Sequence, residues 1–257
     1  MRIPKDIYGD LRRHLEVEMQ AGRRFAPLDP AAAAAFLAIP TGGAPARTPA
    51  VAAQAPAAAP AVAKDSLQAI AAQIAQCTAC GLHQSRTNAV PGVGNANAPD
   101  VMFIGEGPGY DEDVQGVPFV GRAGRLLTKM VEAMGYSRND VFIANIVKCR
   151  PPGNRTPDQS EMVACMPYLL RQIALVKPKT IVALGGTALK GLTDNPAASI
   201  TRARGMWDTF NGIPMMPTFH PAYLLRFPTA KAEAWRDLKA VLKRLGKTPP
   251  RGGGGSG

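Results

Sequence analysis

The sequence predicts an α/β fold: a single three-layer domain in which helices cover both faces of a mostly parallel sheet. Three observations support this class. Short apolar stretches that end in glycine alternate with amphipathic stretches of helical period. The chain has 257 residues, which is enough for one medium domain with a buried core. An Ala/Pro-rich segment that cannot bury a core separates this pattern from the N-terminus.

The elements of the domain follow one another along the chain in strand–helix order. Strands are expected in "DVMFIGEG", "DVFIANIVKC", "TIVALGG" and "IPMMPTFHP". Helices are expected in "SLQAIAAQIAQC", "AGRLLTKMVEAMG", "PDQSEMVACMPYLLRQIALVKP", "TALKGL" and "AKAEAWRDLKAVLKRL". Ligands of such sheets bind beyond the carboxyl ends of the strands. The candidate site therefore lies in the loops after Ile104, Ile146, Leu184 and Phe219.

Four segments are expected from composition. Residues 1–25 contain a short amphipathic helix, which docks either on the domain or on a protein partner. Residues 26–64 form a disordered Ala/Pro linker, and residues 65–246 form the folded domain. Residues 247–257 are a flexible tail, "KTPPRGGGGSG".

The folded part carries most of the positive charge. The net charge is +11, and residues 66–257 hold 22 Lys/Arg against 13 Asp/Glu. This excess favours a polyanionic partner such as nucleic acid. No apolar run is long enough to cross a bilayer, and the N-terminus lacks the apolar core of a signal peptide. We therefore expect a cytoplasmic, nucleoid-associated monomer whose cysteines are not in structural disulfides.

The four cysteines all lie in the domain, as Cys77, Cys80, Cys149 and Cys165. A redox Cys-x-x-Cys pair would leave the last two without a role, and the second pair is too widely spaced for a zinc ribbon. Four thiolates with none to spare favour an iron–sulfur cluster. Zinc and buried structural thiols remain as alternatives. His83 is a possible rival ligand.

Two loops carry candidate chemistry. The stretch "IGEGPGYDEDVQGVPFVGRAG" is neither a Walker motif nor a dinucleotide fingerprint, and its acidic run would repel a phosphate. In "TFHPAYLLRFP", His220 ends the last strand, while Leu224, Leu225 and Arg226 fit insertion into DNA. The alternative for the two leucines is that they cap the core.

Together these segments resemble the family-4 uracil-DNA glycosylases, the iron–sulfur branch of the uracil-DNA glycosylase superfamily. The resemblance runs from Cys77 to Arg226, in "CTACGLHQSRTNAVPGVG", "FIGEGPGYDEDVQGVPFVGRAGRLL", "NIVKCRPPGNRTP", "ACMPYL" and "MPTFHPAYLLR". It implies a four-stranded parallel sheet between helices and a structural 4Fe–4S cluster on the four cysteines. The implied reaction hydrolyses the N-glycosidic bond of deoxyuridine in single- or double-stranded DNA, which releases uracil and leaves an abasic site.

The resemblance also implies roles for individual residues. Phe119 would stack on the flipped base, Asn145 would bond the uracil edge, and His220 would stabilise the departing anion at O2. Gly105 and Gly107 would let the backbone approach the base and its sugar. No lysine in the matched motifs is placed as an amine nucleophile, so a monofunctional enzyme is expected.

Two departures qualify this expectation. The best-known branch has a water-positioning aspartate where this chain has Gly107, so Glu106 and Glu112 become the candidates. Glu112 is also a candidate for excluding the 5-methyl group of thymine. A covalent branch uses a histidine in a loop that reads "ITRARGMW" here, without histidine. Arg202 and Arg204 in that loop are interpreted as DNA-phosphate contacts. A non-catalytic Fe–S DNA-binding protein of the same fold is the alternative function.

Overall fold

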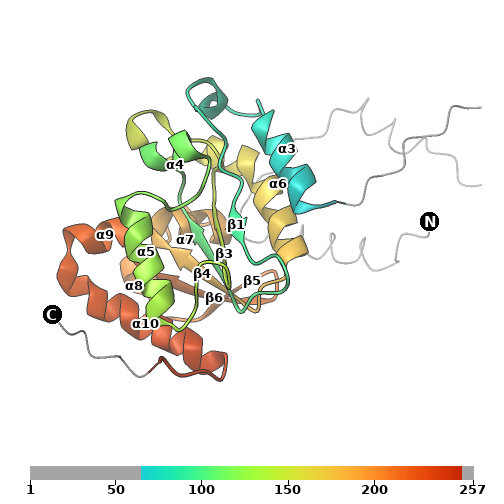
Figure 1. Cartoon of the computed structure of the whole chain (residues 1–257). Coiled ribbons are helices and arrows are strands. Elements are labelled where there is room, and N and C mark those ends of the chain that lie inside the picture. The colour runs from blue at the N-terminus through green and yellow to red at the C-terminus, as the bar shows by residue number, and fades with distance from the viewer. Residues whose placement is uncertain (1–64, 251–257) are drawn as a thin grey trace, which may run out of the picture. The chain divides into compact units, whose positions relative to one another are not determined.

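The structure of the chain is a computed structural model that describes residues 65–250 (Figure 1). The helix expected at residues 1–25, the linker 26–64 and most of the expected tail lie outside the described residues. None of the helices that the structure describes is long and apolar enough to span a membrane.

A six-stranded mixed sheet forms the centre of the domain. Its order is β1-β3-β2-β4-β6-β5, and the four central strands are parallel. Two short edge strands, β1 and β5, pair antiparallel. The bounds are β1 Val93–Gly94, β2 Val101–Gly105, β3 Phe142–Asn145, β4 Thr180–Leu184, β5 Asp208–Phe210 and β6 Ile213–Thr218. The four parallel strands confirm the expected sheet, and the edge strands were not anticipated.

Helices cover both faces of this sheet, as expected for three layers (Figure 1). On β2, Met102 and Ile104 pack with the helices of one face, and Val101 and Phe103 pack with those of the other. One face is covered by α3 (Leu67–Ala75), α6 (Gln159–Val176) and α7 (Gly185–Thr193), the other by α5 (Arg122–Ala133) and α10 (Lys231–Arg244). Burial on both sides explains why the central strands read as continuous apolar runs.

Several short helices interrupt segments that were expected to be loops. They are η1 (Gly81–Gln84), α4 (Tyr110–Gln115), η2 (Pro152–Asn154), α8 (Ile200–Ala203), α9 (Pro221–Arg226) and η3 (Pro228–Ala230). The acidic run Asp111, Glu112 and Asp113 forms the first turn of α4. Carboxylates at this end of a helix are favourable because they face its free N–H groups. Part of this acidic run is therefore explained by local structure.

The four parallel strands end at one edge of the sheet. Gly105 pairs with Asn145 across β2 and β3, and Leu184 pairs with Thr218 across β4 and β6. The loops that leave these residues are those predicted to carry the site.

Candidate active site

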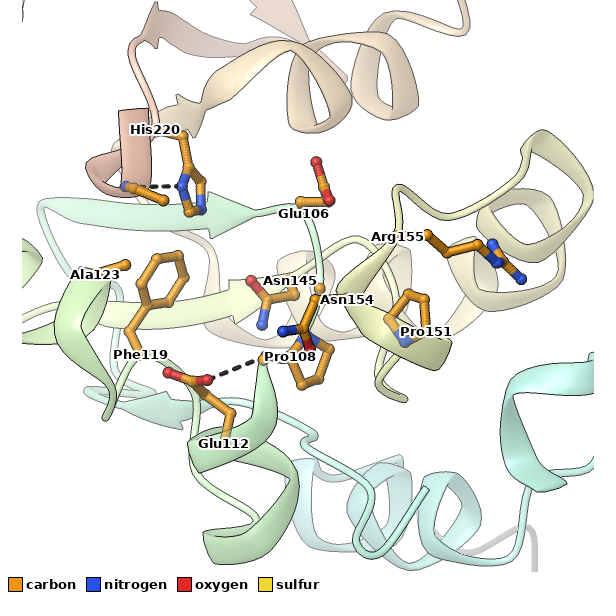
Figure 2. Close-up of a pocket in the computed structure, with 13 residues that line it drawn as sticks. Glu106, Pro108, Glu112, Phe119, Ala123, Asn145, Pro151, Asn154, Arg155 and His220 are labelled. Atoms are coloured by element: carbon orange, nitrogen blue, oxygen red, sulfur yellow. Dashed lines mark hydrogen bonds between the residues drawn. The ribbon is translucent and has the colours of Figure 1, made fainter. Parts of the chain in front are cut away.

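A cavity of about 210 Å³ opens at this edge of the sheet (Figure 2). It brings together most of the predicted pocket residues: Glu106, Gly107, Glu112, Phe119, Asn145 and His220. The remaining lining residues, which the sequence did not single out, are Pro108, Gly109, Ala123, Pro151, Asn154, Arg155 and Ala222. The pocket is therefore assembled from the ends of β2, β3 and β6 and from two glycine-rich turns of the loop after β2, at residues 107–109 and 118–121.

Asn145 presents an unused hydrogen-bond acceptor at the pocket. The residue ends β3 and is 1% exposed. Its Oδ1 is buried and has no hydrogen-bond partner among the described residues. Leaving a buried acceptor unpaired costs about 1–3 kcal/mol. A ligand that donates a hydrogen bond to Oδ1 and accepts one from the amide nitrogen would recover this cost.

Phe119 forms an aromatic wall of the same pocket. Its ring centroid lies 5.6 Å from that of His220, with the two planes tilted by 35° (Figure 2). A Cβ at Gly105 would lie 2.5 Å from Phe119 Cζ and 2.5 Å from Asn145 Oδ1. Gly105 does not line the cavity itself, but its missing side chain lets both residues occupy their positions.

His220 is held as a neutral imidazole. It is the N-cap of α9, and its Nδ1 accepts a hydrogen bond from Ala222 N at 3.1 Å. Burial, reinforced by the charge of Arg226, lowers the pKa of His220 to about 4. The neutral ring then carries its proton on Nε2, which is free to donate. Gly185 passes directly beneath, since a Cβ there would lie 2.9 Å from that of His220.

The two glutamates of the pocket differ in their partners. Glu106 follows β2, and its Oε2 accepts a hydrogen bond from the Thr187 hydroxyl in the first turn of α7. Its other oxygen, Oε1, has no hydrogen-bond partner within residues 65–250. This leaves one carboxylate oxygen at the cavity.

Glu112 is instead bonded to the backbone. Oε1 accepts from Val120 N and Gly121 N, both at 2.9 Å. Oε2 accepts from Gly109 N at 3.1 Å (Figure 2). Three backbone donors occupy this carboxylate, so Glu112 is less free than Glu106 to orient a water molecule.

These groups together suit a flat polar ring. An aromatic wall, an amide with an unused acceptor and a neutral imidazole donor surround one cavity. The amide can read a donor beside an acceptor on one ring edge, and the imidazole can stabilise negative charge that develops on the ring. The carboxylate of Glu106 can face positive charge or a water molecule on the other side.

A buried lysine supports Asn145 from behind. Lys148 is 1% exposed, and its Nζ donates to the Asn145 carbonyl at 2.8 Å and to Gln172 Oε1 at 2.7 Å. Gln172 in turn donates to Pro91 O at 2.7 Å. The backbone N–H of Lys148 donates to Cys165 Sγ at 3.3 Å. One residue thus joins the pocket to the cysteine region.

The four cysteines line a second, small cavity. Cys77 and Cys80 come from the segment after α3, Cys149 from the segment after β3, and Cys165 from α6. All four are free thiols. Burial raises the pKa of Cys149 and raises that of Cys165 to about 11. Thiolates here need positive charge nearby, as a bound metal centre would supply.

The surroundings of the cysteines fit a four-thiolate site. Arg86 donates to Cys149 Sγ at 3.1 Å and to the Ala75 carbonyl at 2.6 Å. His83 lines the same cavity, but its Nδ1 contacts the Cys80 carbonyl at 2.7 Å, which occupies one ring nitrogen. Within residues 65–250, no three His, Cys, Asp or Glu side chains are placed to hold a single metal ion.

The predicted DNA contacts separate into two groups. Arg202, Leu225 and Arg226 are exposed, as a surface contact requires. Leu224 is 1% exposed and packs with Phe219 and Ala234, which matches the alternative that it caps the core. To act as a wedge, Leu224 would have to leave this packing.

Arg204 is also occupied within the protein. Its side chain is 17% exposed and forms an ion pair with Asp237, which is itself buried. It also donates to the Glu233 carbonyl at 2.8 Å, and its guanidinium lies 5.4 Å from the centre of the Phe219 ring. A phosphate contact at Arg204 would have to compete with these bonds. The structure thus favours a role in fixing the segment that leads into His220.

The residues that support the pocket and the cysteines by contacting other groups were not identified from the sequence. Arg86 and Lys148 lie inside segments that carry the resemblance, but no role was expected for either, and Thr187 and Arg138 lie outside those segments. Lys148 carried one weak signal, because a lysine in the apolar run "FIANIVKC" must be buried or paired.

Comparisons with known proteins agree with this geometry. The profile of the Uracil DNA glycosylase superfamily matches residues 91–239. A type-4 uracil-DNA glycosylase of Thermotoga maritima is 49% identical over 164 residues, which cover 63% of this chain and 85% of that protein. One from Saccharolobus solfataricus is 44% identical over 193 residues, 72% of this chain and 89% of that protein.

A type-5 relative is more distant. The type-5 uracil-DNA glycosylase of Mycobacterium leprae is 31% identical over 165 residues, 59% of this chain and 70% of that protein. The higher identity and coverage of the type-4 enzymes decide between the two branches. This chain belongs to the type-4 branch of the uracil-DNA glycosylase superfamily.

Proposed function

We propose that this type-4 uracil-DNA glycosylase hydrolyses the N-glycosidic bond of deoxyuridine in DNA through the pocket at the ends of β2, β3 and β6. The observation that carries the proposal is the unpartnered, buried Oδ1 of Asn145 beside Phe119 and His220. A base inside a duplex cannot reach such a pocket, so the nucleotide must leave the stack first.

Asn145 and Phe119 select the base. Uracil has an N3–H donor beside the O4 acceptor, which complements the Oδ1 and Nδ2 of Asn145. Cytosine has an acceptor and a donor in these places and would leave the buried oxygen unpaired. Phe119 stacks against the flat ring. Gly105 and Gly107 keep the backbone close to the base and sugar, since Cβ atoms there would collide with Asn145 and Val147.

His220 stabilises the leaving group. Its Nε2–H donates to uracil O2, where negative charge grows as the glycosidic bond breaks. A neutral imidazole suits this task, because it need not give up its proton to the base. The hydrogen bond from Ala222 N to Nδ1 keeps the tautomer fixed.

Glu106 is the better candidate for the attacking water. Its Oε1 is free of partners in the described residues, while Thr187 fixes its Oε2. As the sugar gains oxocarbenium character, the carboxylate also offsets its positive charge. Glu112 lines the pocket but has three backbone partners, which supports a part in shaping the site and in excluding the 5-methyl group of thymine.

The four cysteines hold a 4Fe–4S cluster in this proposal. Their shared cavity and the hydrogen bonds from Arg86 and the Lys148 backbone support it. The cluster would supply no chemistry to the reaction. It would tie the segment after α3, the segment after β3 and α6 together, because its four ligands come from these three places.

DNA binding is proposed to use exposed side chains of α8 and α9. Arg202, Leu225 and Arg226 are exposed and are proposed to contact the DNA. The chain is proposed to act as a monomer on single- or double-stranded DNA. A protein partner for residues 1–25 stays a proposal from the sequence.

A base-excision assay tests the function. The wild type is incubated with a uracil-containing oligonucleotide, and alkali-labile abasic sites are counted. Asn145→Ala and His220→Ala should each slow base release strongly while DNA binding in a gel shift stays close to wild type. Binding without base release by the wild type would favour the non-catalytic alternative, and equal losses of binding and rate would contradict the two roles.

A further inference from the structure

We propose that Arg138 and Glu112 are positioning residues that clamp the turn at residues 118–121 from opposite sides and so hold Phe119 in its left-handed backbone conformation. The proposal deepens the proposed function and rests on the stacking role of Phe119.

The backbone of Phe119 is in an unfavourable region. Its φ is +55°, a value that bulky side chains rarely adopt. Such conformations persist only where the surroundings over-determine them, and they gather at functional sites. Phe119 is nevertheless buried and lines the candidate active site.

Packing brings this turn very close to helix α5. A Cβ at Gly124 would lie 1.9 Å from the Phe119 carbonyl oxygen. The turn therefore passes over α5 at a point where only glycine fits. Close packing fixes where the turn lies, but it does not satisfy the polar groups of the turn.

Arg138 binds the carbonyl side of the turn. One guanidinium nitrogen donates to Phe119 O at 3.1 Å and to the Thr128 hydroxyl at 3.2 Å. The other donates to Pro118 O at 2.8 Å. The planar guanidinium is suited to two adjacent acceptors in a fixed geometry. Within residues 65–250 Arg138 forms no ion pair, and its hydrogen bonds go to this turn and to α5.

Glu112 binds the N–H side of the same turn. Its Oε1 accepts from Val120 N and Gly121 N, the two residues after Phe119. Its Oε2 accepts from Gly109 N in the other glycine-rich turn. One carboxylate thus joins the two turns of the loop after β2.

The two charges also act on each other. Burial lowers the pKa of Arg138, and the negative charge of Glu112 opposes this shift. The cation on the carbonyls and the anion on the N–H groups each match the dipole of the peptide units that they bind. Loss of either would free part of the turn, and Phe119 could then relax toward negative φ, which would move its ring.

The decisive experiment combines Arg138→Gln with Phe119→Gly. Glycine adopts positive φ without strain, so Phe119→Gly removes both the ring and the need for a clamp. Four proteins are compared: wild type, each single variant and the double variant. Single-turnover base release and the thermal midpoint are measured for all four. Arg236→Gln, an exposed arginine on α10, controls for the loss of one positive charge.

We expect Arg138→Gln to slow single-turnover base release by about 10- to 100-fold, since small misplacements of a binding group have effects of this size. In the Phe119→Gly background, the same change should have almost no further effect on the rate and should lower the thermal midpoint less than in the Phe119 protein. Arg138→Lys should restore part of the rate, and Glu112→Gln should slow base release in the same direction.

If the effects of Arg138→Gln and Phe119→Gly on the rate and on the thermal midpoint simply add in the double variant, Arg138 does not act through Phe119 and the proposal is wrong. An unchanged rate in Arg138→Gln would overturn it as well. If Phe119→Gly alone released uracil at the wild-type rate, the stacking role in the proposed function would fail. The thermal midpoints would then still show whether the effect of Arg138→Gln depends on the residue at position 119, and so whether Arg138 holds the strained turn.

Discussion

A Cβ atom at Gly105 would lie 2.5 Å from Oδ1 of Asn145. The same atom would lie 2.5 Å from Cζ of Phe119. The side chains of Asn145 and Phe119 therefore meet at the last residue of β2, where there is room for hydrogen only.

We expect Gly105→Ala to slow uracil release by about 100-fold or more, because the methyl group must displace Asn145, Phe119 or both. The backbone of Gly105 has no positive φ, so the substitution should cost little through strain. Single-turnover kinetics measure the effect. Gly81→Ala is the matched control, since a Cβ there meets nothing within 4 Å. Wild-type kinetics in Gly105→Ala would show that the pocket is not as tight as described.

His220 should make stability depend on pH. Burial lowers the pKa of His220 to about 4 in the folded state, against the ordinary value of 6.5. Between these two values the unfolded chain binds more protons at this residue, so stability falls as the pH drops from about 6.5 to about 4. The slope contributed by one such group is at most about 1.4 kcal/mol per pH unit.

Urea unfolding of the wild type and of His220→Gln over this pH range measures this contribution. The wild type should lose stability relative to the variant as the pH falls. Parallel stability curves for the two proteins would mean that His220 is not buried as a neutral ring.

The fold and the centre of the pocket were readable from the sequence for a physical reason. Central parallel strands are buried on both faces, so β2, β3 and β4 appear as unbroken apolar runs with glycine or a polar residue at the end. Asn145 is one of these end residues, and it lines the candidate active site. The edge strand β1 has only two residues, which is too short for a pattern.

The contacts that support the pocket could not be predicted from the sequence, because they join residues that are far apart along the chain and close only in the folded protein. Arg138 bonds the carbonyls of residues about 20 positions earlier in the chain. Leu224 and Leu225 are adjacent in the sequence, yet a helical turn buries the first and exposes the second. From the sequence, the acidic run "DED" was explained only by the charge of the ligand that it would accept or repel. In the structure, Glu112 and Asp113 bond backbone N–H groups.

Lys148 should matter for stability more than an ordinary lysine does. Lys148→Met would leave the Asn145 carbonyl and Gln172 Oε1 without their donor in a buried region. Each unpaired acceptor costs about 1–3 kcal/mol, so we expect a loss of about 2 kcal/mol or more in the free energy of unfolding. Urea unfolding measures it, with Lys129→Met at an exposed position of α5 as control. Equal stability of the two variants would contradict the network.

Substitutions of the cysteines and of His83 should differ in their effect on the iron content of the protein. Cys149→Ala or Cys165→Ala should lower iron from about four atoms per chain and bleach the visible absorbance. His83→Ala should retain both, because His83 contacts the Cys80 carbonyl through Nδ1 and is not needed as a ligand. Iron analysis and the thermal midpoint are the measurements. Full iron in a cysteine variant, or its loss in His83→Ala, would reassign the ligands.

Variants of Arg202, Arg204 and Arg226 should differ in how their DNA binding responds to salt. Arg202 and Arg226 are exposed, so Arg202→Gln and Arg226→Gln should each lower the slope of log Kd against log salt by about one.

Arg204→Gln should leave that slope unchanged, because the guanidinium is already bonded to Asp237 and Glu233. It should instead lower the free energy of unfolding by about 3 kcal/mol, since it leaves the buried Asp237 without its counter-charge. Binding titrations at several salt concentrations, with urea unfolding of each variant, test the division. If Arg204→Gln lowered the slope of log Kd against log salt and kept the wild-type stability, Arg204 would instead be a DNA contact.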